Sequence, residues 1–311
     1  MFKIQFTKLL SWFDSSNIKV SENTSEVIDW LRVIPFILMH FACLLVFVYG
    51  WSPVALWIAL FSYLIRMFAI TAFYHRYFSH KAFKTSRVCQ FLFALLGATA
   101  TQRGAIWWAA HHRQHHLYSD QDKDIHSPRH GFWWSHMGWF LCLKNFTTRE
   151  KFVRDLIKFP ELRWLDRFDI LIPILYGISM WGLGKWLSIS YPELHTSGGQ
   201  MIVWGYLIST IALIHCTLCV NSLAHVMGSK RYITNDDSRN NGLIAFLTLG
   251  EGWHNNHHHY PVSARQGFFW WEIDVSYYLL TLMAYLGLVW DLQPIPVERL
   301  RSNLISQKAE R

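Results

Sequence analysis

Histidine is the residue type in this chain whose number and spacing most clearly point to chemistry. The sequence contains 17 histidines, and nine of them fall into four groups along the chain. The groups are His75 and His80; His112, His115 and His116; His225; and His254, His257 and His258. Neutral imidazole binds Fe, Zn, Cu or Ni in preference to Mg or Ca. The pattern therefore predicts a polyhistidine metal centre.

Two of these groups share the spacing His-x-x-His-His, with residues at i, i+3 and i+4. On a helix these positions lie within an arc of about 100°, so we expect each triplet to point at one spot. His75 and His80 diverge on a regular helix unless it ends or bends between them. Nine imidazoles exceed what one ion can bind, so two metal ions fit the count, with water completing their ligand sets. The division of the nine ligands between the two ions stays open.

The other histidines are expected to play lesser parts. His40 and His215 lie within apolar segments, where a structural hydrogen bond is favoured over an ion path. His111 and His259 adjoin the triplets but lie outside their arcs. The histidines without a helical partner are expected at the solvent or the interface, namely His126, His130, His136 and His195.

A short acidic run, Asp120, Asp122 and Asp124, follows the first triplet. We expect a solvated turn here, with support of a metal-bound histidine as the alternative. Zinc protease, nucleophile-elbow, P-loop and dinucleotide-binding motifs are absent from the sequence.

The elements that position these residues are mostly apolar. Of the 311 residues 52% are apolar and 16% charged, against a usual charged share of about 25%. A mean hydropathy of +0.13 shows that a large part of the chain also faces water. The net charge of +8 comes without a nucleic-acid-binding motif, so no nucleic-acid partner is predicted.

Runs of about 20 apolar residues predict four membrane-spanning helices. They lie at 33–49, 53–73, 168–188 and 201–222. Two weaker segments are not expected to cross the membrane. The segment 88–110 contains Gln102 and Arg103 and is expected to be interfacial or buried, and 276–291 is expected to form an amphipathic helix at the interface.

The four spans predict an all-α integral membrane protein with a helical cap that carries the dimetal site. All Lys and Arg residues except Arg66 and Lys185 fall on one side of the membrane, which by the positive-inside rule is the cytosol, with both termini there. This arrangement also brings all four histidine groups to one face. The predicted units are an N-terminal segment 1–32, hairpin 33–73, cap segment 74–167, hairpin 168–222 and cap segment 223–311.

The sequence resembles the membrane fatty acyl desaturases of the stearoyl-CoA Δ9 type. The resemblance rests on four ordered histidine motifs and on two connecting segments, and it covers about 74–275. The motifs are HRYFSH at 75–80, HRQHH at 112–116, NSLAH at 221–225 and EGWHNNHH at 251–258. The connecting segments are DIHSPRHGFWWSHMGW at 124–139 and SARQGFFWWE at 263–272.

The resemblance implies an enzyme with two Fe ions that uses O2 and two electrons to place a cis double bond, usually Δ9, in a saturated acyl chain. The nine grouped histidines match the family's metal ligands, and Asn221 matches a position that binds a metal through water. Gln102, Trp108 and Thr217 match family positions along the substrate tunnel. Tyr63, twelve residues before His75, is a candidate plug for the tunnel's far end.

One departure from the family concerns the acyl carrier. Animal acyl-CoA members have an Arg-Asp pair before the second motif, where this chain has Ala110 and His111. The carrier is therefore expected to be CoA or a membrane lipid. The sequence contains no Cys cluster for an iron–sulfur centre and no haem or flavin module, so a separate electron donor of the ferredoxin, flavodoxin or cytochrome b5 type is expected. The bacterial-like organisation favours the bacterial inner membrane over the endoplasmic reticulum.

Two other functions compete with this interpretation. A histidine-motif di-iron hydroxylase of acyl or alkane chains would have the same metals and a different product, but NSLAH and the 263–272 segment favour the desaturase. A zinc transporter or metal-binding membrane protein would need ionisable ligands near the middle of the membrane. The predicted spans offer only His40, Arg66, Lys185 and His215 for that purpose.

Overall fold

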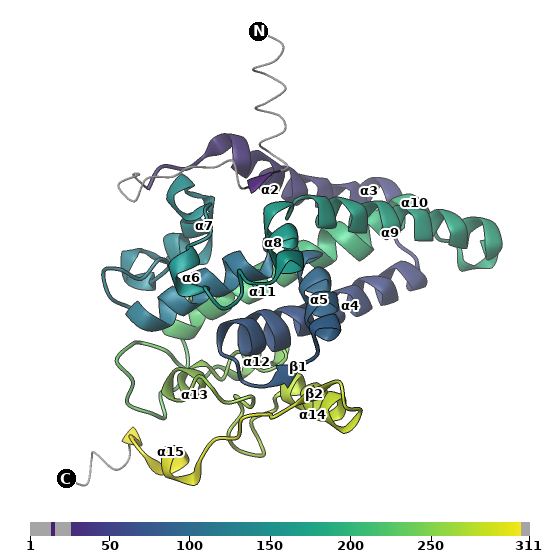
Figure 1. Cartoon of the computed structure of the whole chain (residues 1–311). Coiled ribbons are helices and arrows are strands. Elements are labelled where there is room, and N and C mark those ends of the chain that lie inside the picture. Colours follow the sequence, from purple (N-terminus) through teal and green to yellow (C-terminus); the bar gives the residue numbers. More distant parts are fainter. Residues whose placement is uncertain (1–13, 16–25, 306–311) are drawn as a thin grey trace.

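The computed structural model describes residues 14–15 and 26–305, and this part of the chain is almost wholly helical (Figure 1). Its one sheet pairs β1 (Lys84–Thr85) antiparallel with β2 (Val289–Trp290), and Lys84 lies opposite Trp290. The prediction of a helical protein is confirmed. Most of the predicted segment 1–32 lies outside the described residues.

Within residues 26–305, two continuous apolar helices are long enough to cross a membrane. The first, Pro53–Ser79, joins α4 (Pro53–Phe68) to the π-helical η3 (Ala69–Ser79). The second, Gly198–His225, has 28 residues. It consists of α10 (Gly198–Gln200), the π-helical η9 (Met201–Ile208), α11 (Ser209–Asn221) and η10 (Leu223–His225). At about 1.5 Å per residue, either helix exceeds a hydrocarbon core of about 30 Å.

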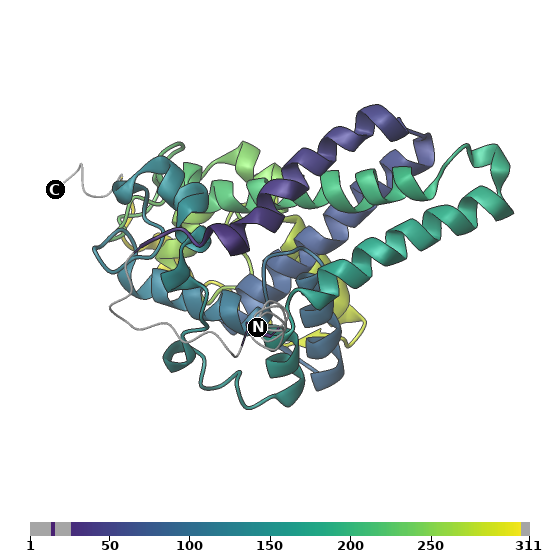
Figure 2. The ribbon, with the colours of Figure 1, turned by 90° about the horizontal axis from the view of Figure 1, so that it is seen from above.

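The other two predicted spans are less regular. The helix α9 (Leu171–Ser190) is bent by 76° from α8 (Pro160–Arg167), and the pair counts as a third candidate if it is one span. The first predicted span contains α2 (Trp30–Ala42), η2 (Cys43–Leu45) and α3 (Val46–Tyr49), which form a shorter apolar helix. Figure 2 shows α3, α4, α9 and the helix that begins at α10 extending from one side of the molecule.

The two weaker segments do not form long helices. Residues 88–110 are divided between α5 (Arg87–Ala98) and α6 (Ala105–Tyr118) by a turn in which Thr101 and Arg103 have φ values of 60° and 69°. The helix expected at 276–291 is shorter than predicted. It is α14 (Val275–Tyr285), and the chain then turns at Gly287, where φ is 71°, before entering β2.

Short elements complete the cap. Between α6 and α8 they are η4 (Pro128–His130), η5 (Trp134–Gly138), α7 (Trp139–Leu141), η6 (Leu143–Asn145) and η7 (Glu150–Phe152). The later cap segment contains α12 (Gly242–Leu247), α13 (His254–His259) and α15 (Val297–Arg301), while η8 (Pro192–Leu194) lies outside the cap, between α9 and α10.

The main hydrophobic core surrounds η3 at the junction of the long helices and the cap. Phe73 is fully buried and stacks on Phe93 of α5 with ring centroids 3.8 Å apart. The ring of Tyr74 packs so closely on Gly97 that a Cβ there would lie 2.2 Å from it. Any larger residue at this position would push α5 away from η3, so Gly97 allows the close approach of the two helices.

Candidate metal centre

The structure brings the nine grouped histidines together in two adjacent clusters. Within each cluster every histidine offers one ring nitrogen, and these nitrogens all lie within 4.8 Å of one another. The five-histidine group contains His75, His80, His112, His116 and His257. The four-histidine group contains His115, His225, His254 and His258. The nine rings are thus gathered in sets of five and four.

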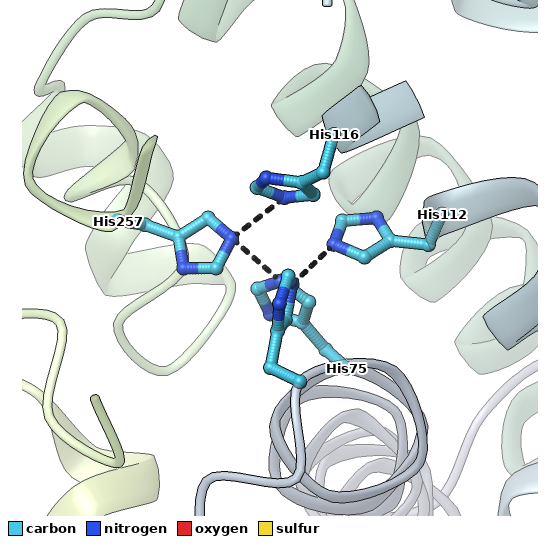
Figure 3. A group of neighbouring side chains, drawn as sticks. His75, His112, His116 and His257 are labelled. Carbon is cyan, nitrogen blue, oxygen red and sulfur yellow. Dashed lines mark hydrogen bonds between the residues drawn. The ribbon is translucent and has the colours of Figure 1, made fainter. Parts of the chain in front are cut away.

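In the five-histidine group the rings turn their Nε2 atoms toward a common centre (Figure 3). The Nε2 atom of His257 lies 3.0 Å from that of His75 and 2.9 Å from that of His116. The Nε2 atoms of His80 and His112 are 2.8 Å apart. These rings come from η3 and His80 directly after it, from α6 and from α13, so three separate segments of the chain build the group.

Each His-x-x-His-His triplet is divided between the two groups, which corrects the expectation that it points at one spot. On α6, His112 and His116 belong to the five-histidine group and His115 to the four-histidine group. On α13 the assignment is reversed, because His257 joins the five-histidine group while its two triplet partners join the other. The reason is that i and i+4 share a helix face, whereas i+3 and i+4 differ by about 100°.

A π-helical turn explains how His75 and His80 converge although an α-helix would separate them. The backbone N–H of His80 donates to the carbonyl of His75, five residues earlier, at 3.2 Å. This i→i+5 bonding widens the turn and stacks residues five apart, and such turns often occur at functional sites. The two rings lie with centroids 4.9 Å apart.

Carboxylates outside the four-histidine group orient three of its rings. These rings donate their Nδ1 protons as follows: His115 to Asp124 at 3.0 Å, His225 to Asp120 at 2.8 Å and His258 to Asp236 at 2.7 Å. A neutral imidazole has one N–H, so Nε2 of each of these rings carries a lone pair. In the five-histidine group, His75 is paired through Nδ1 with Glu251.

The chemistry of this donor set fits a metal ion. The Nε2 atoms of His115 and His258 are buried and have no hydrogen-bond partner among the described residues. That of His225 lies 3.0 Å from Nε2 of His254. Buried lone pairs that face each other without a donor are costly, whereas a cation between them satisfies all of them at once. Carboxylate partners on the outer ring nitrogen are the usual arrangement for metal-bound histidine.

The protonation of the site also suits metal binding, which requires neutral imidazole. Burial, reinforced by neighbouring imidazoles, holds the pKa of His80, His112 and His257 well below the usual histidine range. Burial opposes ionisation of Asp120 and Asp124, but their histidine partners outweigh it and hold the pKa of both carboxyls well below the usual range. The rings of His80, His112 and His257 are therefore held neutral, and ionised carboxylates lie beside the four-histidine group.

A narrow cavity of about 30 Å³ adjoins both groups. Its lining includes Asn221, Trp108 and Thr217, together with His112 and His254. Asn221 therefore shares this cavity with histidines of both groups. Its role as a ligand, like those of the nine histidines, stays a prediction.

The remaining tunnel candidates, Gln102 and Tyr63, do not line this cavity. The side-chain amide of Gln102 donates to Thr217 at 3.1 Å and accepts from the indole N–H of Trp108 at 3.4 Å, so it fixes both lining residues. Tyr63 packs against the core, and its hydroxyl donates to the carbonyl of Leu247 at 2.6 Å. It is not among the residues that line the cavity.

Several residues have surroundings that sequence reasoning missed. Asp120 and Asp124 are 3% exposed and bind histidines, so the expectation of a solvated turn is wrong for them. The alternative that we considered, support of a metal-binding histidine, describes their contacts. His126 and His136 are also buried, in contrast to the prediction, whereas His130 and His195 are exposed. Asp236 carried no sequence signal, because its partner His258 is far away along the chain.

Comparison with known proteins gives a consistent result across most of the chain. The family model described as fatty acid desaturase matches residues 49–285. The sn-2 palmitoyl-lipid 9-desaturase of Nostoc sp. (strain 36) is 35% identical over 277 residues, which cover 87% of this chain and 92% of that protein.

Two further relatives have similar coverage. The sn-1 stearoyl-lipid 9-desaturase of Anabaena variabilis is 34% identical over 274 residues, or 86% of this chain and 95% of that protein. An acyl-CoA 5-desaturase of Anemone leveillei is 36% identical over 300 residues, or 92% of this chain and 88% of that protein.

Proposed function

The chain belongs to the fatty acid desaturase family and is a fatty acyl desaturase, and we propose that it places a cis double bond at Δ9 of a saturated chain. The Δ9 position is supported by the names of the two cyanobacterial relatives, both 9-desaturases. The family also contains relatives named for other positions, among them the Anemone leveillei 5-desaturase.

The observation that carries the proposal is the pair of histidine groups beside one cavity. Two Fe ions fit this donor set, one held by the five-histidine group and one by the four-histidine group with Asn221 through water. Iron bound there would supply the oxidising power, drawn from O2 and two electrons, that breaking an unactivated methylene C–H bond requires. The protein's own residues would position the metals, exclude water and hold one pair of methylenes of the acyl chain next to the metals.

The residues around the cavity are suited to choosing the methylenes. Adjacent methylenes are chemically alike, so only their position against the metals can distinguish them. We propose that Trp108 and Thr217, fixed by Gln102, form the part of the acyl tunnel nearest the metals. Tyr63 on α4 would limit how much of the acyl chain extends past Trp108 and Thr217. Replacement of Tyr63 by Ala should then lengthen the preferred substrate.

We propose that the acyl carrier is a membrane lipid, with CoA as the alternative. Ala110 and His111 are both buried in α6, so these positions offer neither charge nor exposure to a CoA head group. Two relatives are named for lipid-bound substrates and one for an acyl-CoA. Purified enzyme should therefore desaturate chains in glycerolipid vesicles faster than the same chains on CoA.

The electron donor is proposed to be a separate ferredoxin, flavodoxin or cytochrome b5-type protein with its reductase, because the desaturation needs two electrons from outside the site. The cap of 74–167 and 223–311 is its proposed docking region.

We propose four spans with both termini and the cap in the cytosol, in a bacterial inner membrane. Alkaline phosphatase fused after His195 should be active, and fused after His130 inactive.

The central test is the fatty-acid profile of cells that express the chain together with a donor system. Wild type should produce new cis monoenes, and His257→Ala should not. His130→Ala, which changes an exposed histidine, is the matched control and should behave as wild type. Double-bond derivatisation and mass spectrometry place the bond. Hydroxylated chains would instead indicate a hydroxylase, and transport of zinc without lipid change would indicate a transporter.

A further inference from the structure

The short helix α12 in the later cap segment has two apolar faces, of which only one packs against protein. Its sequence, GLIAFL, contains no polar side chain. On the inner face Ile244 is buried in a cluster with Val220 and Ala224 at the end of the second long helix. On the outer face Leu243 and Phe246 are 69% and 79% exposed. An exposed apolar face of this kind marks an interaction surface.

A hydrogen bond fixes the depth of α12 against the first long helix. The hydroxyl of Tyr63 on α4 donates to the carbonyl of Leu247, the last residue of α12, at 2.6 Å. Tyr63 lies ten residues after Pro53, where the long helix begins, or about 15 Å along it. The hydrocarbon core of a membrane is about 30 Å thick. With Pro53 at the outer edge of this core, as the proposed topology places it, the end of α12 lies near the middle of the membrane.

Hydrogen bonds at both ends of α12 suit a helix in hydrocarbon. The side-chain oxygen of Asn241 accepts from the backbone N–H groups of Leu243 and Ile244, both at 3.1 Å. At the other end, the hydroxyl of Tyr63 satisfies the carbonyl of Leu247. Helix ends that face water can bond to water, whereas in lipid each free backbone group needs a partner from the protein.

Exposed tryptophans lie near the start of α12, toward the cap. The ring of Trp253 adjoins Gly242, because a Cβ on this glycine would lie 3.8 Å from it. The indole N–H of Trp253 donates to the carbonyl of Ile273 at 2.8 Å. Directly before Ile273 in the sequence, Trp270 and Trp271 are both exposed. Tryptophan is enriched at membrane–water interfaces, so this arrangement fits a helix that starts at the interface and ends in the core.

The two faces of α12 adjoin different surroundings. The outer face lies beside the part of α4 around Tyr63, where Phe61 is 63% exposed and faces lipid in the proposed topology. The inner face closes the cavity beside the histidine groups. Val220, which packs with Ile244, lines this cavity, and so does Thr248, the residue directly after α12. A single helix therefore lies between the cavity and the exposed surface.

We propose that α12 is a re-entrant helix that contacts lipid acyl chains in the cytosolic leaflet and forms the wall between this lipid and the cavity. The inference rests on the proposed desaturase function and membrane topology. It places part of the 223–311 cap segment inside the membrane, although that topology puts the segment in the cytosol. Lipid chains of this leaflet then lie one helix away from the proposed metals, so a lipid-bound substrate would reach the cavity without passing through water.

Photocrosslinking in vesicles of phosphatidylcholine and phosphatidylglycerol tests this contact. A p-benzoylphenylalanine at Phe246 should capture lipid acyl chains about as well as one at Phe61. It should capture about tenfold more than one at Gln121, because hydrocarbon is confined to the membrane core. Gln121 is the matched control, since it is exposed next to the charged Asp122 and Lys123. A yield at Phe246 no higher than at Gln121, or crosslinks to a second copy of the chain in place of lipid, would overturn the proposal.

Hydrogen exchange in the same vesicles is a second readout. Amides of α12 should exchange about tenfold more slowly than those of α15, which is similarly short but exposed, because hydrocarbon excludes water. Tyr63→Phe keeps the ring but removes the bond to Leu247, so it should speed exchange in α12. Tyr77→Phe removes a hydroxyl bond to Gln90 and is the control, without effect on α12. Equal exchange in α12 and α15 would contradict the proposal.

Neither readout requires turnover, so the two proposals can fail separately. A chain that captures lipid at Phe246 but never desaturates in the presence of a donor system would contradict the proposed function and support the position of α12 in lipid. A chain that desaturates but fails both readouts would contradict the position of α12 and leave the proposed function intact.

Discussion

The two histidine groups use similar ligands but are supported in different ways. Around the four-histidine group, separate aspartates hold His115, His225 and His258. Around the five-histidine group, Glu251 pairs with His75, and buried Arg76 donates to both Glu251 and Asp274. The first group thus lies in a more anionic shell, whereas the second is supported by ion pairs internal to the fold. Two metals bound there would not be equivalent.

The largest expected effect comes from removing one ligand of each group. His116→Ala and His258→Ala should each abolish desaturation and lower bound iron from about two ions per chain to about one, since metal affinity depends on the full ligand set. Elemental analysis of purified protein measures the metal. His259→Ala is the control, because its ring binds the carbonyl of Arg299 instead. If either variant lost both ions, the groups would not be separate.

Next in size is the loss of the buried arginine on the five-histidine side. Arg76 is 1% exposed, and Arg76→Gln would leave Glu251 and Asp274 buried without their cation. Unpaired buried charges cost about 3–5 kcal/mol, so we expect a marked loss of thermal stability in detergent. Arg87→Gln breaks an exposed pair with Glu161 and should change stability by less than about 1 kcal/mol. Equal effects would contradict the role of buried ion pairs in supporting the five-histidine side.

A smaller effect is expected from neutralising one aspartate of the four-histidine group. Asp236→Asn keeps an oxygen near His258 but removes the charge, and loss of such support typically lowers metal affinity about 10–100-fold. Chelator titration followed by elemental analysis should show one ion leaving earlier and the other unchanged. Release of both ions together would show that the two supports are coupled.

The smallest effect concerns a carboxyl that should act on both groups alike. Asp166 accepts from the backbone N–H of Trp107 in α6, which carries ligands to both groups, and burial raises its pKa to about 6. A raised carboxyl pKa favours the neutral form in the folded state, so stability should fall as the pH rises from about 4 through 6. Asp166→Asn should remove this dependence, a difference of a few degrees in melting temperature.

The sequence predicted the helical fold, the nine gathered histidines and the positions of the long apolar helices at 53–73 and 201–222. It failed where the outcome depends on partners from distant segments. The π-turn that joins His75 to His80 requires η3 to pack against α5 and α6, which no local pattern encodes. The burial of Asp120 likewise depends on His225, and that of His136 on His215.

Each His-x-x-His-His triplet contributes ligands to both histidine groups, and this has a consequence for the synthesis of the protein. Because α13 contributes to both groups and lies late in the chain, neither group is complete until the ribosome has passed His258. Both apolar hairpins are synthesised before that point. Binding of the two proposed metal ions would therefore require a chain synthesised at least as far as α13, and products truncated before α13 would lack ligands of both groups.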